Sequence, residues 1–184
     1  MKIAADSRGL TISGSGSAIA TVDIQQDQCY WEVELAKFDA DAGAAFAIGV
    51  ARRKALVPPA RKKAGATQSR GNNLAGHALG DGKLSWALKS ASSTCAFAEG
   101  DVIGVAYDGL TTGKPTLHFY QNGVKLPGAS IVIRARGVSG ALAPAVAITA
   151  GGAKLTGNFS VDRGDFTFPP PAKYEGIIPA KSML

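Results

Sequence analysis

The sequence predicts an all-β protein built as an antiparallel β-sandwich. Many short segments of the 184-residue chain alternate apolar and polar residues, which is the pattern of a strand with one face on a core. Glycine, asparagine, serine and proline separate these segments where turns are expected. The sequence contains no internal repeat and no amphipathic helical pattern. Periodicity by itself leaves a jelly roll or a barrel open as alternatives.

Length and composition place the chain among globular proteins. With 184 residues and 46% hydrophobic content it suits a single domain, residues 1–184. The first residues lack the apolar run of a secretory signal, and no stretch approaches the roughly 20 apolar residues that span a bilayer. We therefore expect a cytoplasmic or nuclear protein that does not enter a membrane. Cys29 and Cys95 are expected to be reduced, buried thiols.

Residues 8–24 are predicted to form two short strands around a Ser-Gly loop at 13–17. The loop is similar to part of a dinucleotide-binding glycine loop, but that motif needs an apolar strand before it and an amphipathic helix after it. The residues that follow, 25–28, are polar and show no helical pattern. A flexible connection between strands is therefore predicted.

Two further strands are predicted before residue 51. Residues 30–35 alternate in polarity, so Trp31 and its alternate neighbours should face the core, and the set containing Glu32 and Glu34 should face solvent. Two glutamates could act as a general acid and base, but an outward pair on a strand is the ordinary solvent-face pattern. Apolar residues alternate again over 46–50, which predicts the inward face of the next strand.

Residues 51–83 form a long basic insertion. Seven lysine or arginine residues and no acid lie between Ala51 and Gly80, and removing these seven would change the net charge from +6 to 6 − 7 = −1. The positive charge is therefore a property of this segment and not of the fold. A loop of this length without periodicity is typical of functional or mobile segments.

The strongest hairpin signal lies at residues 99–126. Two alternating runs, 102–107 and 116–120, are predicted strands with one set of residues on the core and the other nearer solvent. Asn122-Gly123 suits a two-residue turn, because both residues tolerate the positive φ that a tight hairpin requires. A short return strand is expected immediately afterwards.

The last strands are predicted at 140–148 and 155–159. Their apolar residues continue the core, and Pro144 should lie at a bulge or at a sheet edge because it cannot donate a backbone hydrogen bond. A turn at 149–152 connects the two strands.

Several phrases of the sequence together resemble the SPRY domain family. They occur in the family's order and are YWEVEL (30–35), FAIGVARR (46–53), LSWAL (84–88), GDVIGVAYD and LHFYQNG (100–123), GALAPAVAI (140–148) and LTGNFS (155–160). The resemblance covers about residues 8–175, which are the expected domain core, and leaves a tail at 176–184. It implies two curved antiparallel sheets packed face to face in a concanavalin-like jelly-roll architecture. It also implies a core role for Trp31, and aromatic and proline residues at 166–174 that pack across the sandwich. The function it implies is a non-catalytic adaptor module that binds proteins.

The resemblance further implies where a partner binds. Recognition surfaces of the family often combine an N-terminal loop, the connection before the Ser-Trp strand and the turn between the last two core strands. With the start of the basic insertion, these positions give the candidate partner-binding residues Ser15, Ser17, Arg52, Arg53, Arg70, Asn72, Asn73, His77, Thr149, Ala150 and Gly151. We expect a protein or peptide partner, for which an acidic segment is compatible with the basic insertion, and a monomeric chain.

The sequence favours neither catalysis nor a metal or cofactor. His77, His118, Cys29 and Cys95 show no paired spacing such as CxxC or HxxxH, and metal sites built on these residue types need three or four ligands. The prediction is a protein that is not an enzyme, with no catalytic residue, no metal and no cofactor.

The alternative function is binding of nucleic acid or another acidic surface through the basic residues at 52–70. Lysine and arginine would neutralise phosphates and release counterions. No aromatic residue lies between Ala51 and Trp86 to stack on bases, so the sequence disfavours nucleic acid, and a solvated loop is the more common reading of such a charge run.

Overall fold

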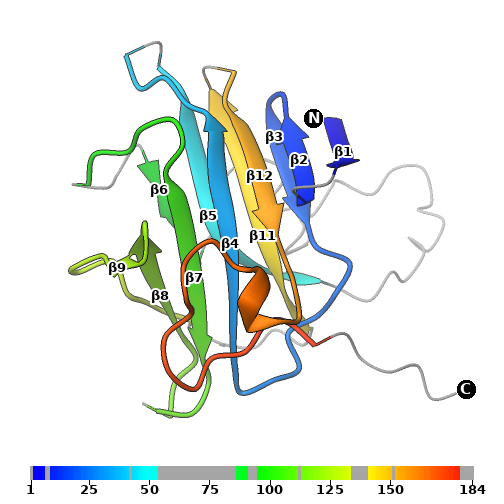
Figure 1. Cartoon of the computed structure of the whole chain (residues 1–184), viewed down its shortest axis with the longest axis vertical. Helices are drawn as coiled ribbons and strands as arrows, with labels where there is room; N and C mark the ends of the chain where they lie inside the picture. Colours follow the sequence, from blue (N-terminus) through cyan, green and yellow to red (C-terminus); the bar gives the residue numbers. More distant parts are fainter. Residues whose placement is uncertain are drawn as a thin grey trace, which may run out of the picture.

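Two antiparallel β-sheets packed face to face make up the part of the chain that the computed structural model describes (Figure 1). That part comprises residues 2–6, 9–41, 43–53, 86–90, 95–111, 113–133, 141–150 and 152–178. Within these ranges there is no α-helix, and a short 3-10 turn, η2 (Arg163–Asp165), follows the last strand. The predicted all-β sandwich is therefore confirmed.

Eight strands form the larger sheet, sheet A, and four form sheet B. The order in sheet A is β1-β2-β12-β4-β7-β8-β10, with β9 paired to β8 off this path, and the order in sheet B is β3-β11-β5-β6. The strands of sheet A are β1 (Lys2–Asp6), β2 (Gly9–Ser13), β12 (Lys154–Asn158), β4 (Gln28–Lys37), β7 (Val102–Asp108), β8 (Thr116–Gln121), β9 (Val124–Lys125) and β10 (Ile131–Val132). Those of sheet B are β3 (Gly16–Ile19), β11 (Ala141–Ala150), β5 (Ala45–Arg53) and β6 (Trp86–Lys89).

The strand ends differ slightly from those predicted. The connection between β2 and β3 is only Gly14 and Ser15, shorter than the loop predicted at 13–17. The predicted hairpin turn is confirmed, with φ of 50° at Asn122 and 80° at Gly123. Phe159 lies one residue beyond β12 and is half-buried, where the sequence predicted the end of a strand and a buried side chain.

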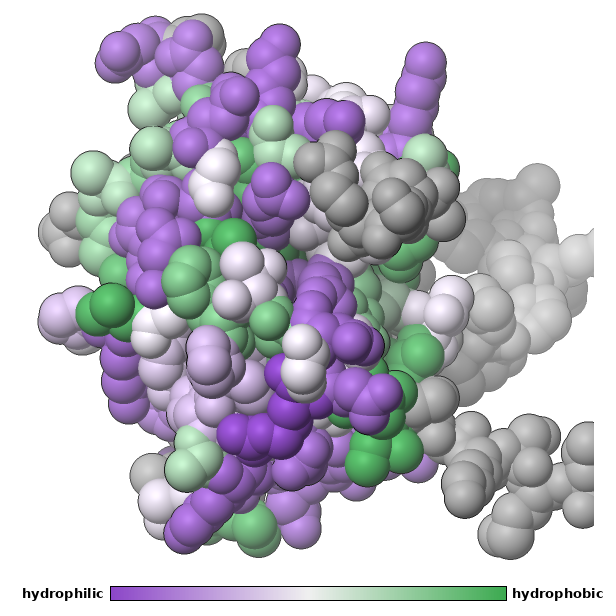
Figure 2. All heavy atoms as spheres, viewed as in Figure 1, coloured by the Kyte–Doolittle hydropathy of each residue, from purple (hydrophilic) through white to green (hydrophobic). Residues whose placement is uncertain are grey.

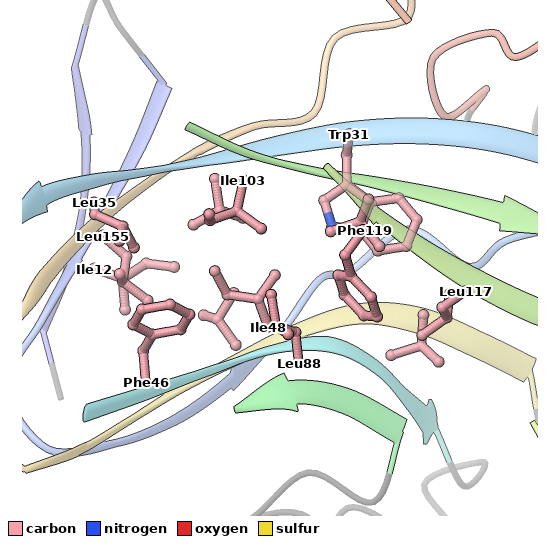
Figure 3. Packing of buried hydrophobic residues seen from close by; sticks show 14 of the residues in the cluster. Ile12, Trp31, Leu35, Phe46, Ile48, Leu88, Ile103, Leu117, Phe119 and Leu155 are labelled. Atoms are coloured by element: carbon pink, nitrogen blue, oxygen red, sulfur yellow. The ribbon is translucent and has the colours of Figure 1, made fainter. Parts of the chain in front are cut away.

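The hydrophobic core fills the space between the sheets (Figure 3). Trp31 is fully buried and shares this space with Phe46 and Ile48 of sheet B and Ile103 and Phe119 of sheet A. Each of these strands contributes its alternate residues, as the periodicity predicted. The indole nitrogen of Trp31 has no hydrogen-bond partner among the described residues, so this side chain contributes by apolar packing.

The prediction that Glu32 faces solvent is wrong. Its side chain does point away from the inter-sheet core, but only 1% of the residue is exposed. Residues 160–178, which we call the C-terminal strap, cross the outer face of sheet A and cover it over part of β4 and β7 (Figure 1). The Glu32 carboxylate accepts hydrogen bonds from the backbone amides of Thr167 at 2.7 Å and Phe168 at 3.0 Å. The second face of this strand is therefore a second buried layer.

Aromatic side chains fill the layer between the strap and sheet A. Tyr30, also predicted to face solvent, is 1% exposed and meets the Phe166 ring edge-on at a centroid distance of 5.0 Å. The Tyr30 ring lies over Gly104 of β7, where an added Cβ would come within 2.1 Å of the tyrosine oxygen. Tyr174 and Ala106 complete this second cluster. As a result β7 is buried on both faces, although the sequence predicted one of them near solvent.

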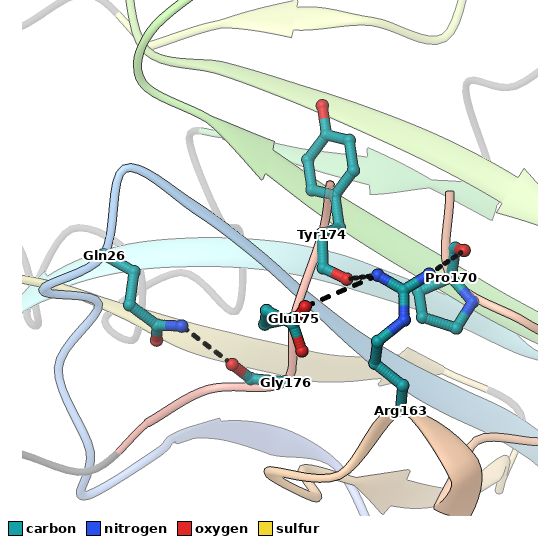
Figure 4. Close-up of polar contacts among 6 residues, drawn as sticks. All are labelled: Gln26, Arg163, Pro170, Tyr174, Glu175 and Gly176. Carbon is teal, nitrogen blue, oxygen red and sulfur yellow. Dashed lines mark hydrogen bonds and ion pairs between the residues drawn. The ribbon is translucent and has the colours of Figure 1, made fainter. Parts of the chain in front are cut away.

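Two polar side chains fix the lower part of the strap (Figure 4). The Arg163 guanidinium donates to the backbone oxygen of Tyr174 and, at 3.1 Å, to that of Pro170. Gln26 donates to the oxygen of Gly176 at 2.9 Å and accepts from the amide of Ile178 at 2.7 Å. The strap is thus held at its backbone, which makes it a fixed layer of the fold.

Pro144 lies neither at an edge nor at a bulge, contrary to prediction. It is inside β11, which pairs with β3 on one side and β5 on the other, and the register shift comes later, between Ile148 and Ala150. The ladder with β3 ends at Ala145, and the amide of Ala20 donates to the Pro144 oxygen at 2.8 Å. The N–H that the proline lacks would point to this same side, just beyond the end of β3, so the β3 ladder stops here while Pro144 keeps its place opposite Val50 of β5.

The remaining sequence expectations concern thiols and membranes. Cys29 is buried as predicted, whereas Cys95 is only half-buried, and the structure has no disulfide between them. Among the described residues, no helix is long and apolar enough to cross a membrane.

Candidate functional site

Three connections have their described residues at one end of the sandwich, which we call the upper rim (the top of Figure 1): 14–15, 38–41 with 43–44, and 152–153. Gly16, at the start of β3, pairs with Ile148 near the end of β11, and Lys154, at the start of β12, pairs with Ser13 at the end of β2. The connections between β2 and β3 and between β11 and β12 therefore lie side by side. Both pass from one sheet to the other, and glycines with positive φ, Gly14 and Gly152, allow the sharp turns.

Four of the predicted partner-binding residues lie at or beside the upper rim. Ser15 is exposed in the connection between β2 and β3, and Ser17 is half-buried in β3 opposite Ala147. Thr149 and Ala150 are the last residues of β11, so the predicted turn starts later than expected. Gly151 lies outside the described residues.

The other predicted residues are not at this rim. Arg52 and Arg53 end β5 and pair with Leu142 and Ala141, at the opposite end of β11 from Ala150. Nine residues of a strand span about 30 Å, so one compact partner site does not contain both groups. Arg70, Asn72, Asn73 and His77, like the rest of the basic insertion from residue 54 to 85, lie outside the described residues.

A row of three lysines on sheet A is the feature of this end that sequence reasoning missed. Lys2 pairs with Ser13, Ser13 with Lys154, and Lys154 with Lys37, so the row crosses β1, β2, β12 and β4. Directly opposite residues share a face of the sheet, and strands lie about 4.8 Å apart, which puts Lys2 and Lys37 about 14 Å apart. Lys2 and Lys37 are exposed and Lys154 is half-buried. Hydrophilic surface is prominent along the top of the same view (Figure 2).

Only the topology brings this lysine row together. Its members are 35 and 117 residues apart along the chain, and each one alone is an ordinary strand-end lysine. Acidic residues partly offset the row on one side, because Asp39 and Asp41 follow Lys37 and are exposed. Glu34, which pairs with Thr156, also lies on this face two residues from Lys154, so the positive charge is least opposed at Lys2.

The nearest approach to catalytic chemistry is at the other end of sheet A. The Nδ1 atom of His118 lies 2.8 Å from the Ser130 hydroxyl. Burial and the nearby Lys125 charge lower the pKa of His118, whereas Asp108 acts in the opposite direction. Asp108 does not orient the imidazole, since its carboxylate accepts from the amides of Leu110 and Thr111, each at 2.9 Å. Among the described residues, the pair therefore has no carboxylate in the place of the third group that a Ser-His nucleophile requires.

Among the residues that the structure describes, no group of three or more His, Cys, Asp or Glu residues is placed to hold a metal ion. In the described part of the chain, the groups that remain for binding a partner are those of the loops, the strand ends and isolated charged residues.

Comparison with known proteins agrees with this architecture. The family model for the SPRY domain matches residues 28–162, from β4 to just beyond β12. The SPRY domain of human HERC1 is 17% identical, with a TM-score of 0.48, over 85% of this chain and 91% of that one. Another human SPRY domain is 14% identical, with a TM-score of 0.45, over 85% of this chain and 94% of that one. No curated protein matches the chain. Because the family model covers most of its length, the chain belongs to the SPRY domain family.

Proposed function

We propose that this chain is a non-catalytic protein-interaction module that binds an acidic segment of a partner protein at the upper rim. SPRY domains are generally protein-interaction modules, which supports the class of function. The choice of the upper rim rests on the row of Lys2, Lys154 and Lys37, which lies beside the exposed connection at Ser15.

The strands beneath the upper rim hold its residues in place, which favours recognition of a partner. Ser13, Lys154 and Lys37 are register partners in the ladders of sheet A, whose inner face packs on the core. Loops and strand ends held in this way lose little conformational freedom on binding, which favours affinity. An acidic partner segment would gain from several lysines at strand spacing, mostly through faster association.

The test is capture of partners by the intact chain, followed by binding kinetics on the proteins that are recovered. Lys2→Glu and Lys154→Glu should slow association severalfold, and added salt should weaken binding to the wild type more than to these variants. Lys125→Glu, an exposed lysine on β9 away from the rim, is the matched control and should leave the rates unchanged. Ser15→Arg should raise the dissociation rate if this connection touches the partner.

The same experiment separates the two candidate surfaces. If Lys2→Glu and Lys154→Glu leave both rates unchanged while reversal of Arg61, Lys62 and Lys63 to Glu abolishes capture, the partner binds the basic insertion and the rim proposal fails. Loss of all captured proteins after nuclease treatment would favour nucleic acid as the primary ligand.

A further inference from the structure

The upper rim continues beyond the lysine row as far as β7. Lys2 and Lys154 form the side of the rim nearest to β1, which we call the basic side. At the other side, the connection 98–101 leads into β7 and lies against the end of β4 (Figure 1). The amide of Gly100 donates to the backbone oxygen of Leu35 at 2.8 Å, which fixes this connection beside β4.

Carboxylates gather on the side of the rim nearest to β7, which we call the acidic side. Asp39 and Asp41, in the connection that follows β4, are exposed, and so is Glu99 in the connection that precedes β7. Glu34, on the outer face of β4, adds a fourth carboxylate and is half-buried. Lys37, on β4, lies between the two sides, one strand from Lys154.

This division of charge restricts which segment fits across the rim. The three lysines of the row are matched by the four carboxylates of the acidic side, so the rim as a whole is not positive. A segment that carries acidic residues along its whole length would be attracted at the basic side and repelled at the acidic side. From β1 to β7 there are four strand spacings, about 19 Å, which an extended segment covers in about six residues.

From this division we infer that the partner segment is bipolar. Its acidic residues lie over the basic side, and basic residues about six positions away lie over the acidic side. This inference rests on the proposed function, because it specifies the partner of the same rim. The order of charges also fixes the direction in which the segment crosses the rim, since the reverse direction would place like charges together at both sides.

The probes for the experiment are three synthetic peptides of about twelve residues, titrated into the intact chain to about 1 mM in low salt and followed by NMR. The bipolar peptide has a glutamate block and a lysine block separated by glycine and serine. The second peptide has the same composition with the charges alternating, and the third has serine in place of every lysine. The bipolar peptide should bind about fivefold more tightly than either of the others, because only it forms ion pairs at both sides.

Spin labels at the peptide ends report the direction of binding. A label at the glutamate end should broaden the amide signals of residues 2–4 most strongly, and a label at the lysine end those of residues 98–100. These two groups of residues lie at opposite sides of the rim. The labels therefore separate one fixed direction from a mixture of the two.

Charge reversals in the chain separate the two sides. Glu99→Lys should weaken binding of the bipolar peptide about threefold and should not weaken binding of the acidic peptide. Lys2→Glu should weaken binding of both peptides. Asp162→Lys, which reverses an exposed acid of the strap next to η2 and away from the rim, is the matched control and should change neither affinity.

The results distinguish this inference from the proposed function. If the acidic or the alternating peptide binds as tightly as the bipolar one, and Lys2→Glu weakens them all, the bipolar segment is ruled out and the proposed function stands. Reversed or mixed broadening by the two spin labels also overturns the bipolar segment. If no peptide binds, or if Lys2→Glu leaves every affinity unchanged, both proposals fail.

Discussion

Glu32 and Thr167 are 135 residues apart in the chain and are joined by a hydrogen bond of 2.7 Å between a buried carboxylate and a backbone amide. The same carboxylate accepts from Phe168 and, at 3.2 Å, from the Tyr30 hydroxyl. A buried charge is tolerated when several donors surround it, and here three donors do so. Glu32 is therefore the point at which the C-terminal strap is fixed to sheet A.

Replacement of Glu32 should destabilise the fold more than replacement of its neighbour on the same face. Glu32→Ala leaves the amides of Thr167 and Phe168 and the Tyr30 hydroxyl without their acceptor and empties a buried site, so we expect a loss of about 3 kcal/mol in the free energy of unfolding. Glu32→Gln keeps an acceptor oxygen and should lose less. Glu34→Ala is the matched control, expected within about 0.5 kcal/mol of wild type. Denaturant titration measures all three, and equal losses at the two positions would contradict the role of Glu32.

Arg163 should hold the strap through its fork of donors and not through its ion pair. The guanidinium bonds two carbonyl oxygens, whereas its partner in the ion pair, Glu175, is 3.7 Å away and both side chains are more than a third exposed. Arg163→Lys replaces the fork with a single ammonium, so hydrogen exchange across residues 160–178 should accelerate about tenfold. Glu175→Gln removes only an exposed ion pair and should leave exchange nearly unchanged. Acceleration by Glu175→Gln alone would reverse this assignment.

Trp31 should stabilise the fold through the apolar volume that its side chain fills and not through a hydrogen bond from its indole N–H. Trp31→Ala empties a fully buried site and should cost about 3 to 5 kcal/mol. Trp31→Phe keeps an aromatic ring and breaks no hydrogen bond to a described residue, so its cost should be about 1 to 2 kcal/mol. Thermal or denaturant unfolding compares them. A cost for Trp31→Phe close to that for Trp31→Ala would show that the indole N–H has a partner after all.

The two cysteines should react at very different rates in the native protein. Burial raises the pKa of the Cys29 thiol to about 12, which leaves almost no reactive thiolate at neutral pH. Cys95 is half-buried. Alkylation of the native chain without reductant, followed by peptide mass spectrometry, should label Cys95 first, and denaturation should expose both thiols. Rapid native labelling of Cys29 would place it nearer solvent than the structure does.

The sequence predicted the inter-sheet core well because that core obeys a local rule. Trp31, Phe46 and Phe119 alternate with polar or small residues along their own strands, and this alternation shows which face is buried. It does not show what covers the other face. Glu32 and Glu34 are indistinguishable in sequence, and only the strap, placed by residues more than 130 positions later, buries the first.

The candidate site was less predictable for the same physical reason. Ser15 and Thr149 were located through the family pattern, but the lysines beside them come from three separate strands. Charge runs are visible in a sequence, whereas a charge row across a sheet depends on strand order and register. Such a row becomes evident only when the topology is known.

Asp108 should make stability depend on pH in the acidic range. Burial alone would raise the pKa of this carboxyl, but hydrogen bonds from Thr111 and Leu110 outweigh it and lower the pKa from 3.8 to about 2. Because the folded pKa lies below the unfolded one, the carboxylate contributes its full stabilisation above about pH 4 and loses it as the pH falls toward 2. The contribution at neutral pH is about 2 kcal/mol.

Asp108→Asn isolates this contribution from that of the other carboxyl groups. The amide oxygen can still accept from the two backbone amides, but the variant carries no charge to lose. Wild type should be more stable than Asp108→Asn by about 2 kcal/mol at pH 6, and the difference should shrink toward zero between pH 4 and pH 2. Urea unfolding of both proteins across this range gives the difference directly. A difference that stays constant from pH 6 to pH 2 would mean that Asp108 stabilises the fold through its shape and not through its charge.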